Sequence, residues 1–150
     1  MQNKQPTLIA CAGPSNDKSI QSFWKDLVLG QDATLIVNLC GEVGRGSDFN
    51  WMVECEQYWP TTKTDHILGF GSNIQVSLLL ETTECETLKS SKLLVNELSR
   101  GVVIKSAHVT MLHFSGWPDC DIPTEEEDVE GFNLMMTKLV THYTAEATRN

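Results

Sequence analysis

Two short apolar runs on either side of an amphipathic segment limit the fold more than any other feature of the sequence. The runs are TLIACA at 7–12 and TLIVNLC at 34–40, and each is apolar on both faces. The segment between them, 19–29, repeats apolar residues at three- and four-residue spacing, as an amphipathic helix does. Two strands joined through a helix are expected to be parallel neighbours with a right-handed crossover, so we predict an α/β fold.

The residues at both ends of the predicted helix are typical of helix termini. Ser15, Asn16 and Asp17 precede it as candidate N-caps, and Gly30 follows it as a stop. Its apolar positions are Ile20, Phe23, Trp24, Leu27 and Val28.

Three later segments read as antiparallel strands. The β-branched runs at 73–83 and 101–114 are typical of strands, and we predict a third strand over 87–98. A short helix over 93–99 is the alternative for part of that third segment. The stretches 41–46 and 58–60 are predicted to be connections.

A final helix is predicted after the turn-rich sequence at 116–123. Thr124 and Glu127 have the spacing of a capping box, and negative charge there suits a helix N-terminus. An apolar stripe at helical spacing then predicts the face that joins the core. It consists of Val129, Phe132, Met136, Leu139, Val140 and Tyr143.

Length and charge exclude several classes of protein. The chain has 150 residues, which suits one domain, and its net charge of -9 makes a nucleic-acid partner a poor expectation. No apolar run approaches the roughly 18 residues that a membrane-spanning helix needs. The N-terminus shows no secretory signal, so we expect a cytoplasmic protein.

The five cysteines do not form a disulfide or zinc pattern. They stand at 11, 40, 55, 85 and 120, an odd number without a C-x-x-C pair. We therefore expect free thiols, no metal and no cofactor. Cys11, Cys40 and Cys55 adjoin apolar segments and are expected to be buried.

Four segments, in this order, carry a resemblance to a known family. They are ACAGP at 10–14, SFWKDLV at 22–28, CEQYWP at 55–60 and LHFSGWPDCDIP at 112–123. Together they resemble the protein tyrosine phosphatase domain. The resemblance implies a partial tyrosine-phosphatase-like fold, a mixed sheet flanked by helices, and a hydrolase that dephosphorylates phosphotyrosine proteins through a phosphocysteine intermediate.

The resemblance assigns a catalytic role to Asp119. In the family the aspartate of the WPD loop is the general acid, which protonates the leaving tyrosine oxygen and then activates the hydrolytic water. Trp117 and Pro118 would complete this loop. From the residues alone, Asp119 is predicted to be a solvated turn residue, and the resemblance reverses that prediction. The residues that bind substrate stay unassigned.

The nucleophile of the family is not found in this sequence. It lies in a His-Cys-x5-Arg loop that follows the WPD loop, and no such motif occurs before Asn150. The nearest match, Cys40 with Arg45, is one residue too short to cradle a phosphate dianion. We therefore expect residues 1–150 to be a partial domain, without the family's N-terminal segment and Cys-x5-Arg region, and inactive alone.

Three departures from the family pattern leave alternatives open. Ala12 stands where the family has Gln, Glu54 where it has Lys, and Cys120-Asp121 where it has His-Gly. The intact parent would act on a phosphotyrosine-containing protein. The alternatives are a pseudophosphatase or protein-interaction module without catalysis, and an unrelated doubly wound α/β domain.

Overall fold

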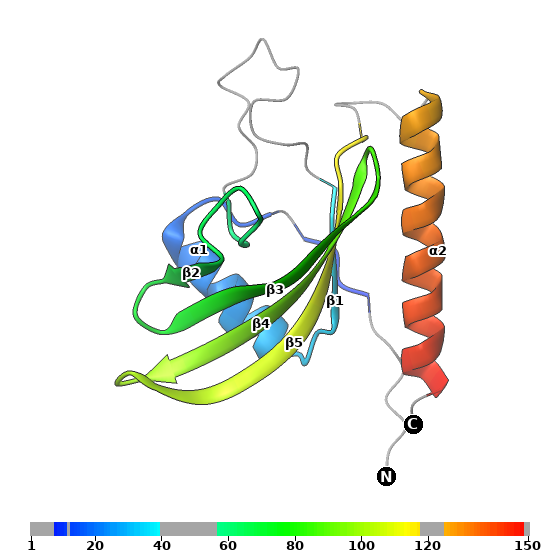
Figure 1. The fold of residues 1–150 in the computed structure, drawn as a ribbon. Helices are drawn as coiled ribbons and strands as arrows, with labels where there is room; N and C mark the ends of the chain where they lie inside the picture. Colours follow the sequence, from blue (N-terminus) through cyan, green and yellow to red (C-terminus); the bar gives the residue numbers. More distant parts are fainter. Residues whose placement is uncertain (1–7, 12, 40–56, 118–124, 149–150) are drawn as a thin grey trace.

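A five-stranded mixed sheet is the centre of the fold. In the computed structural model, residues 8–11, 13–39, 57–117 and 125–148 are described. The strands lie in the order β1-β5-β4-β3-β2 (Figure 1). Their bounds are β1 Leu35–Asn38, β2 Ile67–Phe70, β3 Ile74–Cys85, β4 Leu88–Ser99 and β5 Val102–Phe114.

One strand pair of this sheet is parallel and the others are antiparallel. β1 lies parallel to β5, with Leu35 opposite Thr110 and Asn38 opposite His113. β5, β4 and β3 form antiparallel neighbours, as predicted for those three segments, and β2 pairs antiparallel with β3. The segment 87–98 is therefore a strand, and the alternative of a helix over 93–99 is wrong. The short strand β2 was not predicted.

The predicted strand at 7–12 is wrong over its described residues. Residues 8–11 adopt no regular secondary structure, and Leu8 is 80% exposed. The parallel partner of β1 comes instead from the far end of the chain, so the expected pairing of 7–12 with 34–40 is also wrong. A short apolar run does not by itself identify the strand that it joins.

The first predicted helix is confirmed and covers one face of the sheet. α1 (Asp17–Ser22) continues directly into a π-helical segment, η1 (Phe23–Leu29). The Asn16 side chain accepts the backbone N–H of Ser19, and Gly30 ends the stretch. Trp24 is fully buried against this face, on which Val109 and Met111 of β5 lie.

The second helix, α2 (Glu126–Thr148), covers the opposite face (Figure 1). Leu112 and Phe114 alternate along β5 with Val109 and Met111, and they pack with Leu88 and Met135 in a separate cluster. The sheet therefore has an apolar layer on each side, one helix to a face. No helix of the described residues is both long enough and apolar enough to span a membrane.

The predicted apolar stripe of this helix is largely wrong. Val129, Met136, Val140 and Tyr143 are 37–57% exposed. The residues of α2 that are buried are Gly131 and Met135, while Phe132 packs beside them half-buried. The most apolar side of α2 therefore does not face the sheet. The side that carries Gly131 does, because a glycine allows the closest approach to the sheet.

Candidate acid loop at the end of the parallel strands

The site that the sequence predicts lies between the end of β5 and the start of α2. Of its three residues, Trp117 is described, whereas Pro118 and Asp119 lie outside the described residues, as do Cys40, Arg45, Glu54 and Cys120-Asp121. The flanks of the segment 118–124 are described on both sides. They are the carboxyl end of β5 and the first turn of α2.

Thr87 bonds to both flanks of this segment. It is 1% exposed and lies in the turn between β3 and β4. Its carbonyl oxygen accepts the Ser115 N–H at 2.9 Å, and its hydroxyl donates to the Glu127 carbonyl oxygen at 3.2 Å. One buried residue therefore holds the end of β5 and the first turn of α2 together. No motif in the sequence identified Thr87.

Two glycines allow the flanks to pack this closely. A Cβ atom on Gly116 would lie 2.6 Å from Asp128 Oδ1 and 2.8 Å from the Phe114 ring. A Cβ atom on Gly131 would overlap Thr87 Oγ1. Both contacts are shorter than heavy atoms tolerate, so α2 can approach the sheet here only with glycine at these positions. The sequence showed the glycines but not the neighbours that require them.

Trp117 is anchored through its ring. It is 37% exposed, and its ring centroid lies 5.8 Å from that of Phe132 on α2. Phe132 in turn lies 6.1 Å from Phe114 of β5. This row of aromatic rings joins the strand, the first residue of the predicted loop and the helix, which suits the anchoring role that the resemblance implies for Trp117.

The carboxyl ends of the two parallel strands meet beside this segment. Asn38 ends β1 opposite His113, and its side-chain amide donates to the Tyr58 hydroxyl at 2.8 Å. The His113 ring packs edge-on against Trp59, with centroids 5.1 Å apart. In open α/β sheets, ligands bind at the carboxyl ends of parallel strands, and this is where β5 leads into 118–124.

The motif segments of the resemblance contact one another through these aromatic rings. Trp24 of the FW pair donates its indole N–H to the Tyr58 carbonyl oxygen at 2.9 Å. Phe23 packs edge-on against both Trp24 and Tyr58. Segments that are far apart in the chain thus form a single support beneath the end of the parallel pair.

Negative charge surrounds the start of α2. The pKa of Glu127 is raised, chiefly by the charge of Glu86 and by a hydrogen bond with its side chain, with smaller contributions from desolvation, Asp128 and Glu125. Glu86 lies in the β3–β4 turn beside Thr87. The two carboxylates therefore repel each other across the same junction that Thr87 holds together.

Neither of the described cysteines lies in a phosphate-binding loop of the kind that the family's nucleophile occupies. Cys11 is exposed, so its predicted burial is wrong, and Cys85 is half-buried with its sulfur 3.9 Å from Thr87 Oγ1. Cys40 and Cys55 lie outside the described residues. Among the residues that the structure describes, no group of three or more His, Cys, Asp or Glu side chains could hold a metal ion.

Comparison with known proteins identifies one family throughout. The sequence model of the family described as "Protein-tyrosine phosphatase" matches residues 1–148. Mouse (Mus musculus) tyrosine-protein phosphatase non-receptor type 13 is 28% identical over 148 residues, which cover 95% of this chain and 6% of that protein. Human receptor-type tyrosine-protein phosphatase alpha is 31% identical over 122 residues, 81% of this chain and 13% of that protein.

Solved structures agree on the fold. The catalytic domain of human protein tyrosine phosphatase non-receptor type 18 superposes with a TM-score of 0.63 at 23% identity, covering 85% of this chain and 39% of that one. A structure of the same phosphatase in complex with HER2-pY1248 phosphopeptides superposes with a TM-score of 0.61 at 22% identity, covering 83% and 41%. The chain thus spans about 40% of these solved domains and a small part of the curated relatives.

Proposed function

Because the chain belongs to the protein-tyrosine phosphatase family, we propose that it supplies the acid-loop part of a phosphatase that removes phosphate from phosphotyrosine proteins. Asp119 is the general acid in this proposal. One observation carries it: Thr87 ties the two flanks of the segment that contains Asp119, at the carboxyl end of the parallel pair β1 and β5.

The chemistry explains why an acid is needed at this position. A tyrosine leaving group departs as a phenolate whose conjugate acid has a pKa of about 10, so cleavage is slow unless a proton arrives as the P–O bond breaks. Asp119 delivers that proton to the tyrosine oxygen. The resulting carboxylate then accepts a proton from the water that hydrolyses the phosphocysteine intermediate. The cysteine belongs to the Cys-x5-Arg loop, which this sequence does not contain.

Partner and location follow from the same proposal. The partner is a phosphotyrosine-containing protein, as supported by the phosphopeptide complexes of the type 18 phosphatase. A cytoplasmic location is supported by the five cysteines, an odd number without a disulfide pattern, since reduced cysteines are typical of that compartment.

The 150-residue chain by itself is expected to be inactive. Purified chain should hydrolyse para-nitrophenyl phosphate no faster than buffer. Cys40 is the thiol to check, and turnover that disappears in a Cys40→Ser variant would mean that this chain carries its own nucleophile.

The role of Asp119 is best tested in a chimera. Residues 1–148, which the family model matches, would replace the corresponding segment in the phosphatase domain of mouse tyrosine-protein phosphatase non-receptor type 13. Asp119→Asn should lower kcat by roughly 10²- to 10⁴-fold, the usual contribution of a general acid, and should remove the fall in rate at alkaline pH. Asp121→Asn removes the same charge from the same segment and should keep most of the activity.

The chimera also distinguishes the proposed phosphatase function from the alternative without catalysis. Equal losses in the Asp119 and Asp121 variants would contradict the assignment of the acid. A folded chimera with no turnover at all would favour a pseudophosphatase or interaction module, which the reversed charge at Glu54 would suit.

A further inference from the structure

A small cavity, open to solvent on one side, lies between the α1–η1 stretch and the turn that joins β2 to β3. Its volume is about 210 Å³. Its polar lining consists of Lys18, Gln21, Ser22, Lys25, Asp26 and Asn73. Because ligand sites for drug-sized molecules occupy about 300–1,000 Å³, this cavity suits an ion-sized group with a few water molecules.

The hydrogen-bond donors around this cavity are unused. The ammonium groups of Lys18 and Lys25 and the side-chain amide of Gln21 have no bonding partner within the part of the chain that the structure describes. Asn73 uses only its amide oxygen, which accepts a weak bond from Ser72. Cationic and neutral donors therefore line one cavity, which is the donor set that an anion requires.

The β2–β3 turn packs against one residue of the cavity lining, Gln21. Gly71 has φ of 64°, a conformation that favours glycine, and a Cβ atom there would lie 2.7 Å from the Gln21 side-chain oxygen. The turn backbone thus packs directly against the Gln21 amide. This packing limits the movement of Gln21 and keeps its amide at the cavity.

Local charge also favours an anion. Lys18 and Lys25 are two helical turns apart on one side of the helix, and Asp26 is the one acidic residue in the lining. Two cations against one carboxylate leave a local charge of +1, in a chain whose net charge is -9. A phosphate group fits these features, since it carries nearly two negative charges at neutral pH and offers at least three acceptor oxygens.

The geometry points to a second phosphate site: this cavity binds a phosphate dianion through Lys18 and Lys25, with the Gln21 and Asn73 amides as additional donors. The site is separate from the end of β5. β2 is an outer strand of the sheet, whereas β5 lies three strands away, a separation of roughly 14 Å at about 4.8 Å per strand.

The test is a titration of the ¹⁵N-labelled chain with sodium phosphate at constant ionic strength. The backbone amide signals of Gln21, Ser22 and Asn73 should shift and saturate. In the double variant Lys18→Gln/Lys25→Gln the affinity should fall by roughly tenfold or more, the loss of two charge-assisted bonds. Asp26→Asn should tighten binding several-fold, because it removes the one repelling charge.

The matched control is Lys63→Gln/Lys92→Gln, which makes the same change in net charge away from the cavity and should leave the affinity unchanged. Saturation by O-phosphoserine as well would identify a site for phosphomonoesters, and saturation by inorganic phosphate alone a site for the free ion. Shifts that do not saturate, or an equal loss of affinity in the control, would overturn the proposal. All four lysines are exposed, so the variants should keep the parent melting temperature as a check on folding.

Discussion

Thr87 is the residue on which the geometry of the acid loop depends most directly. Its hydroxyl donates across the β3–β4 turn to the first turn of α2, while its carbonyl holds the end of β5. Thr87→Val preserves the shape of the side chain but removes the donor. We expect the free energy of unfolding to fall by about 1 kcal/mol, the usual net value of one hydrogen bond.

Urea denaturation of the chain measures this loss, and Thr87→Ser is the control because it keeps the hydroxyl. In the chimera, the valine variant should also lower kcat more than it raises KM, since it loosens the segment that carries Asp119. A valine variant as stable and as active as the serine variant would show that the hydroxyl does not hold the loop.

Gly131 shows that a helix glycine can be required by its neighbour. An alanine there would gain up to about 1 kcal/mol in helix propensity, but its methyl group would overlap the buried Thr87 hydroxyl. Overpacking costs typically about 1–3 kcal/mol, and making room would move the Thr87 hydroxyl away from the Glu127 carbonyl that it bonds to. We expect Gly131→Ala to destabilise the chain by about 1–2 kcal/mol.

The control for that substitution is Gly69→Ala on β2, where the nearest atom to an added Cβ is 4.0 Å away. Thermal unfolding should show a lower midpoint for the Gly131 variant and little change for the Gly69 variant. A Gly131 variant more stable than the parent would mean that α2 does not approach the sheet this closely.

The repulsion between Glu86 and Glu127 predicts a pH dependence of stability. The pKa of Glu127 is raised in the folded chain above its ordinary value of 4.5, so the folded state binds more protons than the unfolded state in acid solution. The repulsion therefore destabilises the fold where both groups are ionised, and this penalty is lost as the pH falls through the raised pKa.

Glu86→Gln removes the main cause of the raised pKa without touching α2. Its melting temperature should exceed that of the parent at pH 7, and the difference should shrink towards pH 4. Asp65→Asn removes one exposed charge elsewhere and should show no such convergence. A Glu86→Gln advantage that stayed constant across this range would contradict the assigned repulsion.

At the scale of the helices and strands, the correct predictions rest on local signals. The first helix follows from its apolar spacing and the Asn16 cap, and the strands β3, β4 and β5 follow from their β-branched runs. These signals act within a few residues of the chain, so one sequence suffices to show them. They do not specify which strand lies beside β1, because that choice depends on packing between distant segments.

The face of α2 was predicted wrongly for a physical reason. Hydrophobic spacing assumes that the most apolar side is buried, whereas here the contact side begins with Gly131 and Met135 and continues into polar side chains. Lys138 pairs with Glu84 at 3.2 Å, and His142 bonds to Thr34 at 2.8 Å. Polar contacts with the sheet therefore orient the helix, and hydropathy alone cannot reveal them.

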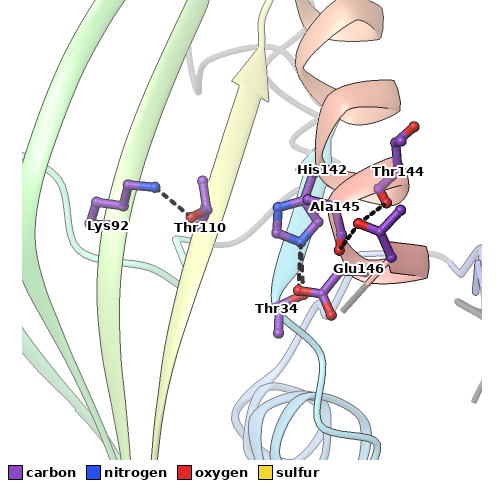
Figure 2. A network of polar contacts seen from close by, with 8 residues as sticks. Thr34, Lys92, Thr110, His142, Thr144, Ala145 and Glu146 are labelled. Carbon is purple, nitrogen blue, oxygen red and sulfur yellow. Dashed lines mark hydrogen bonds and ion pairs between the residues drawn. The ribbon is translucent and has the colours of Figure 1, made fainter. Parts of the chain in front are cut away.

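The last of these contacts fastens the C-terminal end of α2 to the start of β1. Figure 2 shows the Thr34 hydroxyl facing both His142 and Glu146 of the helix. The Thr34 hydroxyl donates to Glu146 at 3.4 Å and shares a hydrogen bond with His142 Nε2 at 2.8 Å, and the ring nitrogen and carboxylate lie 3.8 Å apart. A single hydroxyl thus joins two elements from opposite ends of the chain.

Thr34→Val should free this end of the helix. We expect a loss of about 1 kcal/mol in unfolding free energy, and faster amide hydrogen exchange over 140–148 than over 128–136. Thr110→Val on the neighbouring strand loses only an exposed bond from Lys92, also drawn in Figure 2, and should cost less than about 0.5 kcal/mol. Equal exchange along the whole helix would show that Thr34 does not hold its end.

At the scale of the whole molecule, several apolar residues of the described surface are uncovered, and two groups of them lie on long elements. One is the outer side of α2, formed by Val129, Met136, Val140 and Tyr143. The other is the start of β5, where Val102, Val103 and Ile104 are 48–63% exposed and where β1 supplies no partner, since it pairs only with Thr110–His113. Uncovered apolar faces and strand edges promote association between chains.

We therefore expect the 150-residue chain to self-associate in a concentration-dependent way, and two variants separate the causes. Val103→Pro removes a backbone hydrogen-bond donor from β5 and disturbs the strand edge to which another chain could pair. Val140→Lys instead places a charge on the exposed apolar side of α2. In sedimentation equilibrium, the variant that restores the 16.7 kDa monomer identifies the region responsible. Because β5 offers backbone hydrogen bonds as well as apolar contacts, we expect the proline variant to have the larger effect. A parent chain that stays monomeric at high concentration would show that neither exposed region causes association between chains.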